Sequence, residues 1–373
     1  MELFELRQAY YSARKYKRRK DDSLEFEIQA EMHLVELLDS INSRSFYSPK
    51  HYSFVVKRPR PREVFAASFI MRILQHYLDI RLRPFMEEEM TDKAFNNRVG
   101  LGTEAAILNV YDDLYNISDG YTKDCWIIKW DLQGYFPNIS QDKVYKVFED
   151  LILRRYQGED IDEIIYIAKV CIFSYPTLNV YRKSPYYEWD EIPNSKSLFK
   201  KPLGIGAAIG WLLWQNLMNY YLNPIDQWAV NDLHLAYSRY VDDSVVITKN
   251  KEMMLALLPE FRQRYKDLGI TMHPDKFYCQ HFSKGLEFLG KHIKYQRIYL
   301  NNKIVNRAFY KVKFPYSTTN YLSCMNSYLG MLKTSSNKTL AIKLLNKISN
   351  TYTKDYINFK IKDNGNKSNT KSY

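Results

Sequence analysis

Residues 237–247 read Tyr-Ser-Arg-Tyr-Val-Asp-Asp-Ser-Val-Val-Ile, a run in which two adjacent acids interrupt residues that favour β-strands. The pattern predicts a β-hairpin that carries Asp242 and Asp243. A sheet core does not bury two neighbouring carboxylates without compensation, and a bound cation would supply it. An Asp-Asp pair taken alone is more often a turn or a helix N-cap, so the rest of the chain decides between the two interpretations.

A third acid follows a separate apolar run. Residues 126–131 read Trp-Ile-Ile-Lys-Trp-Asp, which predicts a buried strand that delivers Asp131 at its C-terminal end. If this strand lies beside the hairpin, Asp131 and Asp242 come together. Two carboxylates that share divalent cations form the two-metal site used for in-line phosphoryl transfer, so the pair predicts that chemistry.

The remaining periodicity predicts a chain that mixes helices and strands. Apolar spacing indicates helices over 24–41, 64–82, 141–156 and 209–222, and a strand over 51–57. Residues 173–201 contain three prolines and several Tyr and Ser, which predicts an irregular insertion. The polar segment 362–373 is expected to be a frayed tail.

Length and composition exclude several classes of protein. The 373 residues are 46% hydrophobic and 15% aromatic, which rules out disorder for most of the chain. No run reaches the roughly 18 to 20 apolar residues that a membrane span needs. The N-terminus lacks the apolar core of a secretory signal, so a cytoplasmic protein without membrane contact is expected. The four cysteines lie far apart without metal-ligand spacing, which argues against a disulfide framework and a zinc site.

The positive charge is concentrated near the C-terminus. The net charge is +12, and residues 301–373 hold thirteen Lys and Arg against two Asp. Apolar positions between Leu340 and Ile348 alternate with lysines, which predicts a helix whose cationic face either binds a phosphate backbone or is simply solvated. A second basic cluster, residues 14–20, has the same two interpretations.

Tyr240-Val241-Asp242-Asp243, together with the segment Asp131-Leu132-Gln133-Gly134-Tyr135-Phe136, resembles the palm signature of a reverse transcriptase. Further stretches fall in the order of the bacterial retroelement enzymes, and the resemblance covers about residues 45 to 295. These stretches are Lys57 and Arg62 with Arg72–His76, then residues 97–106, 219–226, 273–276 and 287–290.

The resemblance implies an α+β fold of the right-hand polymerase type. Residues 1–125 would form an N-terminal segment and fingers, 126–300 a palm with an antiparallel sheet, and 301–373 a small basic helical thumb with a polar tail. The implied activity is RNA-directed DNA synthesis from deoxynucleoside triphosphates by two-metal nucleotidyl transfer. The expected cofactor is a pair of Mg²⁺ ions, with Mn²⁺ as an alternative, and the expected partners are an RNA template or noncoding RNA and the DNA product.

The resemblance also assigns roles to individual residues. The metal ligands would be Asp131, Asp242, Asp243 and the main-chain carbonyl of Leu132. Lys276 would donate a proton to pyrophosphate, Lys57 and Arg62 would contact the triphosphate, and Phe136 would be the steric gate against ribonucleotides, with Gln215 also near the nucleotide. Phe288, Leu289 and Gly290 would form the primer grip. Lys57, Arg62 and Lys276 also read as plain surface charges, and Phe136 as a core aromatic.

One segment departs from the family. Motif B commonly reads Gly-Leu-Pro-x-Gly-x-x-x-Ser-Gln in bacterial relatives, whereas residues 206–215 read Gly-Ala-Ala-Ile-Gly-Trp-Leu-Leu-Trp-Gln. Gly210 is kept, but Trp214 replaces the small serine, and Trp211 adds a second indole. The indoles either pack into the palm or face the template, where they would stack on a base and restrict template use.

The compact chain with its altered motif B resembles bacterial defence-associated reverse transcriptases, which act against phage. That likeness implies a noncoding RNA and a second polymerase or effector protein as partners, and it is compatible with a homo-oligomer. The enzyme of a diversity-generating retroelement is the alternative, and a catalytically silent RNA-binding scaffold is the alternative of another class. The 32 tyrosines also permit protein priming, although no particular tyrosine is marked for it.

Overall fold

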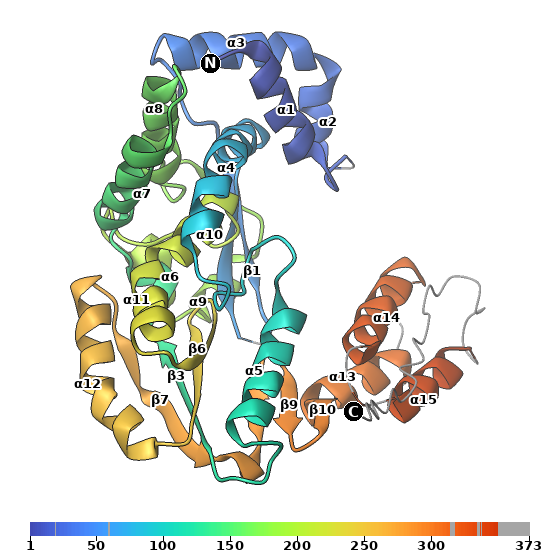
Figure 1. Ribbon diagram of the computed structural model, residues 1–373. Helices are drawn as coiled ribbons and strands as arrows, with labels where there is room; N and C mark the ends of the chain where they lie inside the picture. The colour runs from blue at the N-terminus through green and yellow to red at the C-terminus, as the bar shows by residue number, and fades with distance from the viewer. Residues whose placement is uncertain (19, 59, 314–317, 334–335, 337, 350–373) are drawn as a thin grey trace, which may run out of the picture. The chain divides into compact units, whose positions relative to one another are not determined.

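The computed structural model describes residues 1–18, 20–58, 60–313, 318–333, 336 and 338–349, which form a mixed helix and sheet structure (Figure 1). The chain divides into two compact units. The first comprises Met1–Gly102, Lys129–Val246 and Glu252–Tyr278. The second comprises Thr103–Ile128, Ile247–Lys251 and Cys279–Tyr373.

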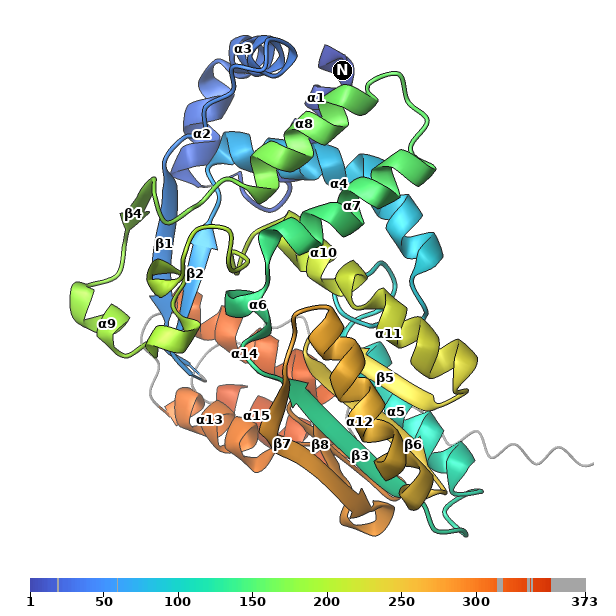
Figure 2. The same cartoon turned by 90° about the vertical axis from the view of Figure 1, so that its left-hand side faces the viewer.

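Helices from the N-terminal part of the chain pack together in the first unit. They are α1 (Leu3–Arg14), α2 (Asp21–Ile28), α3 (Ala30–Asn42) and α4 (Phe69–Glu89). Helix α1 lies along α4 (Figure 2), and its apolar positions Leu6, Ala9 and Ala13 are buried. The helix predicted over 24–41 is interrupted at Gln29, whose φ of −133° and ψ of 44° are not helical.

A three-stranded sheet in the order β2-β1-β4 follows these helices in the first unit. Strand β1 (His51–Val56) confirms the predicted strand and pairs with β2 (Arg62–Ala66) in an antiparallel hairpin. The helix predicted over 64–82 is wrong at its start, because residues 64–66 complete this hairpin. Helix α4 begins only after Ser68, whose hydroxyl accepts a hydrogen bond from the Met71 amide at 3.4 Å.

One helix packs against two others in the middle of the first unit: α7 (Gln141–Arg155) contacts both α8 (Ile161–Ile172) and α10 (Leu212–Tyr221), as Figure 2 shows. Of these, α7 matches the helix predicted over 141–156. Helix α10 starts three residues later than predicted, because Gly210 has a φ of +107° that no helix contains. The predicted insertion 173–201 holds only short elements: β4 (Val180–Arg182), α9 (Tyr186–Asp190), η1 (Asn194–Lys196) and η2 (Leu198–Lys200).

The second sheet has the strand order β5-β6-β3-β7. Its strands are β5 (Ala236–Tyr240), β6 (Asp243–Thr248), β3 (Trp126–Leu132) and β7 (Met272–His281), which confirms the hairpin predicted over 237–247 and the strand predicted over 126–131. Helix α12 (Lys251–Asp267) anchors this sheet, because the buried indole of Trp130 lies 5.0 Å from the Phe261 ring and donates a hydrogen bond to the Tyr265 hydroxyl at 3.4 Å. The elements α6 (Tyr135–Asn138), α11 (Asn223–Gln227) and η3 (Trp228–Asp232) connect the strands and helices.

The second unit contains its own sheet and a helical cluster. Its elements are α5 (Thr103–Ile117), η4 (Phe282–Lys284), β8 (Leu286–Phe288), β9 (Lys291–Lys294), β10 (Arg297–Leu300), α13 (Asn302–Lys313), α14 (Thr318–Lys333) and α15 (Lys338–Ser349). Helix α15 confirms the predicted basic helix: Leu344 is fully buried among α13 and α14, and Lys343 is exposed. The predicted frayed tail 362–373 lies outside the described residues.

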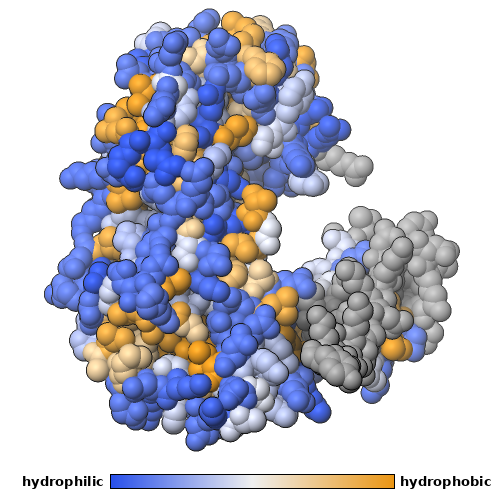
Figure 3. All heavy atoms as spheres, in the orientation of Figure 1, coloured by the Kyte–Doolittle hydropathy of each residue, from blue (hydrophilic) through white to orange (hydrophobic). Residues whose placement is uncertain are grey.

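The mixture of helices with antiparallel sheets agrees with the predicted α+β class. The division into fingers, palm and thumb with boundaries at 125 and 300 stays a prediction. Within the described part of the chain, no helix is long and apolar enough to cross a membrane. Figure 3 shows hydrophilic residues over most of the visible surface of the N-terminal helices, with hydrophobic residues in small separate groups.

Candidate active site

The two-residue turn between β5 and β6 holds an unusual backbone conformation. Val241 has a φ of +59°, a left-handed value that is costly for a β-branched residue. Two side chains fix this turn: the Val241 amide donates to Oδ1 of Asn96 at 3.0 Å, and Nη1 of Arg239 donates to the Val241 carbonyl at 3.2 Å. Strained backbone of this kind persists only where its surroundings determine it, and it places Asp242 next in the chain.

A buried ion pair supports the turn from below. The side chains of Arg239 and Asp226 are both 0% exposed, and Nε of Arg239 donates to Oδ1 of Asp226 at 2.8 Å. The Tyr237 hydroxyl donates to the same oxygen at 2.9 Å, and Nη2 of Arg239 donates to the Asn219 carbonyl at 3.0 Å. This pair was not predicted from the sequence, although an Arg in the middle of an otherwise uncharged strand indicates an internal partner.

The structure brings Asp131 and Asp242 together at the ends of adjoining strands. The Leu132 amide donates to the Asp242 carbonyl at 3.2 Å, which ties β3 to the catalytic turn. Burial, together with the negative charges of Asp131 and Asp243, raises the pKa of Asp242 to about 6. Oδ1 of Asp131 is buried and has no hydrogen-bond partner among the residues that the structure describes. Asp131 and Asp243 thus lie near enough to Asp242 to act on it electrostatically, and carboxylate oxygens are the ligands that hard divalent cations prefer.

Two lysines partly neutralise these carboxylates. Nζ of Lys276, on β7, forms an ion pair with Oδ2 of Asp131, and Nζ of Lys129 lies 3.0 Å from Oδ1 of Asp243. Lys129 was not predicted, yet it stands two residues before Asp131 on the same strand, so the two side chains share one face of the sheet. Within the described residues, no three His, Cys, Asp or Glu side chains already converge on one metal position.

Phe136, the predicted steric gate, lies beside motif B. It is half-buried on α6, and its carbonyl accepts a hydrogen bond from the Ala207 amide at 2.8 Å. The next links are from the Gly206 amide to the Ile139 carbonyl at 2.7 Å and from the Phe65 amide to the Ile209 carbonyl at 2.8 Å. Motif B therefore joins the segment after Asp131 to the β1–β2 hairpin.

Gly210 permits the close approach of motif B to the β1–β2 hairpin. A Cβ atom at this position would lie 2.6 Å from the Phe65 carbonyl oxygen, closer than any side chain tolerates. Gln215 follows on the first turn of α10 and is half-buried. Its backbone amide donates to the Trp211 carbonyl at 3.3 Å. The structure thus gives Gly210 a packing role, and the contact of Gln215 with a nucleotide stays a prediction.

Both indoles of motif B are packed inside the first unit. Trp211 and Trp214 are each 1% exposed. The Trp211 ring meets the edge of the buried His51 ring at a centroid distance of 5.0 Å. The burial agrees with the interpretation that the indoles fill the core, and it leaves no exposed ring face on which a template base would stack.

The predicted triphosphate contacts, Lys57 and Arg62, flank the loop that joins β1 to β2. Lys57 follows β1 and forms an ion pair with Glu188 of α9 at 2.8 Å, a hydrogen bond that raises the pKa of Lys57. Arg62 begins β2, pairs in the strand register with Val56, and is exposed. Lys57 must release Glu188 to bind a phosphate, whereas Arg62 has no such competitor in the part of the chain that is described.

The predicted primer grip belongs to the second unit. Phe288 is fully buried at the end of β8, and Leu289 and Gly290 form the two-residue turn to β9. Both turn residues have positive φ, 50° and 80°, which matches the turn type that joins short hairpins. Contact of this turn with a primer stays a prediction.

Carboxylates gathered at strand ends, one of them with a raised pKa, are the kind of side chains that nucleotidyl transfer with divalent cations uses. Residues 49–293 match the family described as reverse transcriptase (RNA-dependent DNA polymerase). The chain therefore belongs to the reverse transcriptase family and is an RNA-directed DNA polymerase, whose template is RNA, whose substrates are deoxynucleoside triphosphates and whose product is DNA. Members of this family typically use divalent metal ions such as Mg²⁺. No curated protein matched the chain.

Proposed function

We propose that Asp131 and Asp242 hold two Mg²⁺ ions, with Asp243 and the Leu132 carbonyl as further ligands, and that this centre copies RNA into DNA. The buried, unpaired Oδ1 of Asp131 beside Asp242 carries the proposal, because an anionic oxygen in such a setting needs a cation. When bound, the ions activate the primer 3′-hydroxyl and stabilise the charge that develops on the leaving pyrophosphate.

The side chains around the carboxylates have complementary tasks in the proposal. Lys276, already held at Asp131 by an ion pair, gives its proton to the departing pyrophosphate. Arg62 and Lys57 bind the triphosphate, Arg62 through its planar guanidinium. The half-buried Phe136 ring lies under the sugar of the incoming nucleotide, where it rejects a 2′-hydroxyl. Gln215 contacts the nucleotide from the first turn of α10.

The larger organisation is part of the same proposal. Residues 1–125 act as the fingers with their N-terminal segment, 126–300 as the palm and 301–373 as the thumb with its tail. In the thumb, the exposed Lys343 of α15 faces solvent and is suited to a phosphate backbone. The turn Leu289–Gly290 contacts the primer, and Gly210 keeps motif B against the β1–β2 hairpin beside the template.

Primer extension on a defined RNA template tests the activity. Purified protein with Mg²⁺ should extend an annealed DNA primer, and Mn²⁺ should substitute for Mg²⁺ with altered rate. Asp131→Asn and Asp242→Asn should each lower the rate by at least about a hundredfold, because each removes a negative ligand from the developing charge. Asp232→Asn, which removes an exposed acid, is the matched control. Equal rates in all four proteins would reject the assignment of the carboxylates.

A role in bacterial antiphage defence is the biological part of the proposal, supported by the likeness of the altered motif B to defence-associated enzymes. The partners would be a noncoding RNA and a second polymerase or effector protein, and the protein would act in the cytoplasm, alone or as a homo-oligomer. Restricted template use is not included, because the buried Trp211 and Trp214 remove the observation on which it rested. Accurate copying of a long mixed-sequence template is therefore expected.

Phage plating on cells that express the protein tests the defence role. Wild-type protein should lower plaque numbers, and Asp131→Asn/Asp242→Asn should abolish the effect. Protection that survives this double variant would instead identify a catalytically silent RNA-binding scaffold. A template repeat and a variable target gene beside the coding sequence would identify the alternative, the enzyme of a diversity-generating retroelement.

A further inference from the structure

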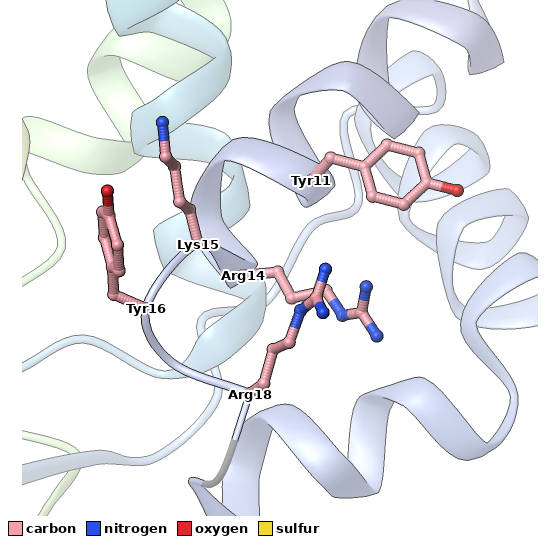
Figure 4. A pocket seen from close by; sticks show the side chains of 5 residues that line it. All are labelled: Tyr11, Arg14, Lys15, Tyr16 and Arg18. Atoms are coloured by element: carbon pink, nitrogen blue, oxygen red, sulfur yellow. The ribbon is translucent and has the colours of Figure 1, made fainter.

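A group of basic and tyrosine side chains surrounds the turn between α1 and α2, away from every residue assigned to catalysis. Tyr11, Arg14, Lys15, Tyr16 and Arg18 line one open pocket of about 530 Å³ (Figure 4). These five residues are called the N-terminal basic patch. They share no residue with the carboxylate site, so the patch poses a separate question about what it binds.

Arg14 gives the patch its shape. Its guanidinium forms an ion pair with Glu27 of α2, with Nη2 3.0 Å from Oε2, and lies 6.0 Å from the centroid of the Tyr10 ring. The Arg14 and Glu27 side chains are 24% and 20% exposed. Because its charge is matched by Glu27, Arg14 holds α1 against α2 and leaves ligand binding to its neighbours.

The neighbouring cations are unmatched. Lys15, Lys17, Arg18 and Lys20 are all exposed, and none of them forms an ion pair within the described residues. Of the nearby acids, Asp22 is engaged by Arg72 at 3.2 Å, and Glu27 is engaged chiefly by Arg14. Adjacent exposed cations without counter-ions repel one another, so an anion that binds several of them at once relieves this repulsion.

Two tyrosine rings stand beside these cations without serving the core. Tyr16 is 91% exposed and its φ is +64°, a left-handed value that directs the residue out of the turn. Tyr11 is 57% exposed and is held against the Tyr10 ring at a centroid distance of 5.1 Å. Figure 4 shows the rings of Tyr11 and Tyr16 on opposite sides of the Arg14 and Arg18 side chains. The Lys15 ammonium lies 5.6 Å from the centroid of the Tyr16 ring, so a cation and an exposed ring are already side by side, and most of the Tyr16 ring surface is open to a planar ligand.

We propose that the N-terminal basic patch binds single-stranded nucleic acid, with Lys15 and Arg18 on consecutive phosphates and a base stacked on Tyr16. Cations that follow a phosphate backbone, combined with aromatic rings for the bases, are the two elements of single-strand binding. A duplex keeps its bases stacked on one another and would leave the rings unused. A free phosphate would use the cations alone. The RNA on which the enzyme acts supplies the required ligand, outside the catalytic centre.

Binding of a labelled oligouridylate of about 20 nucleotides, long enough to cover one single-strand site, tests the proposal with the full chain at several salt concentrations. Lys15→Gln/Arg18→Gln should lower the slope of log affinity against log salt by about 1.4, since each lost phosphate contact contributes about 0.7 for single strands. Tyr16→Ala should weaken binding about fivefold or more with the slope unchanged, because stacking is not a salt effect.

Matched substitutions elsewhere in the first unit serve as controls. Arg262→Gln/Lys266→Gln removes two exposed cations of α12, and Tyr47→Ala removes a ring that is 80% exposed. The proposal is overturned if the patch variants bind oligouridylate as tightly as these controls do. It is also overturned if polyglutamate binds the wild-type protein as tightly as oligouridylate does and if Tyr16→Ala weakens neither interaction. An oligothymidylate arm identifies whether RNA or the DNA product is the preferred strand.

A second measurement separates this site from the active site. Extension of a short, pre-annealed template–primer duplex should proceed at the same rate in Lys15→Gln/Arg18→Gln, Tyr16→Ala and the wild type, because none of these three residues belongs to the proposed catalytic, nucleotide or primer contacts. Loss of extension together with a lowered melting temperature in both patch variants would overturn the proposal in favour of a structural role. Failure of wild-type extension with intact oligouridylate binding would instead count against the proposed catalytic residues alone.

Discussion

Arg239 and Asp226 form an ion pair that is completely buried beneath the catalytic turn. A buried pair of this kind contributes little net stability, because desolvation of the two charges offsets their attraction. Its retention has a positional explanation here. Arg239 reaches past Asp226 to the Val241 carbonyl, and the left-handed Val241 sets the direction in which Asp242 leaves the turn. The pair therefore positions Asp242, the proposed metal ligand.

The single substitution Arg239→Met should destabilise the fold by about 3–5 kcal/mol, because it leaves the buried Asp226 carboxylate without a positive counter-charge. The double substitution Arg239→Met/Asp226→Leu removes both charges and should recover most of that free energy of unfolding. Urea denaturation of the two variants beside the wild type measures these differences.

Activity separates positioning from stability in the same variants. The double variant should remain at least about tenfold below the wild type in kcat, because the bond to the Val241 carbonyl is still missing. Its KM for deoxynucleotides should change little, since neither residue contacts the nucleotide. Recovery of both stability and kcat in the double variant would show that the pair has no positioning role.

Phe136→Ala should let the enzyme accept ribonucleotides. Removal of the half-buried ring opens the space beneath the sugar, and the ratio of ribonucleotide to deoxynucleotide incorporation should rise about tenfold or more. Single-nucleotide extension with each triphosphate measures the ratio. Phe4→Ala, at a ring that is 60% exposed on α1, is the matched control. An unchanged ratio in Phe136→Ala would leave the ring as a core aromatic only.

Gly210→Ala should disturb motif B more than another glycine substitution of similar backbone angle. The φ values of Gly210 and Gly204 are both positive, but only at Gly210 would the new Cβ collide with a carbonyl oxygen, that of Phe65. Gly204→Ala meets no atom within 4 Å and reports the cost of the backbone angle alone. Gly210→Ala should lose about 1–3 kcal/mol more in free energy of unfolding. Equal losses would mean that motif B moves freely away from the β1–β2 hairpin.

The main features of the candidate site could be predicted from the sequence because local patterns of apolar residues indicate where strands end. The apolar run before Asp131 and the apolar residues around Asp242 and Asp243 each define a strand, and the family resemblance joins them. The counter-ions were harder to find. Lys129 is visible from its two-residue spacing to Asp131, whereas the pairing of Lys276 with Asp131 requires a partner 145 residues away.

Other features depended on tertiary contacts that no local pattern contains. The predicted helix over 64–82 failed at its start because the pairing of β1 with β2 overrides helical periodicity at residues 64–66. The position of Trp211 and Trp214 was undecided in the sequence, since an apolar helix face packs equally well against a core or a ligand. Trp211 packs against His51 of β1, and α10, which carries Trp214, lies against α4 and α7.

The buried His51 should make the fold sensitive to mild acid. Its Nδ1 accepts a hydrogen bond from the Ser68 amide at 3.1 Å, and its Nε2 lies 3.0 Å from the Ser48 hydroxyl, so the neutral ring has Nδ1 unprotonated. Burial lowers the pKa of His51 to about 4, and burial with the nearby Arg72 and Arg83 lowers the pKa of His76 to about 4. A proton on Nδ1 of His51 would face the Ser68 N–H and abolish the bond.

The direction of the pH effect follows from these values. Between about pH 6.5 and pH 4, the His51 and His76 rings bind protons in the unfolded chain but stay neutral in the folded chain. The free energy of unfolding therefore falls as the pH is lowered through this window and levels off below it. The contribution of His51 should approach about 3 kcal/mol. His51→Asn keeps an acceptor for the Ser68 amide but does not titrate, so its free energy of unfolding should fall less steeply than that of the wild type. His234→Asn replaces an exposed ring and should retain the wild-type slope. A His51→Asn slope equal to that of His234→Asn would refute the neutral, buried state of His51.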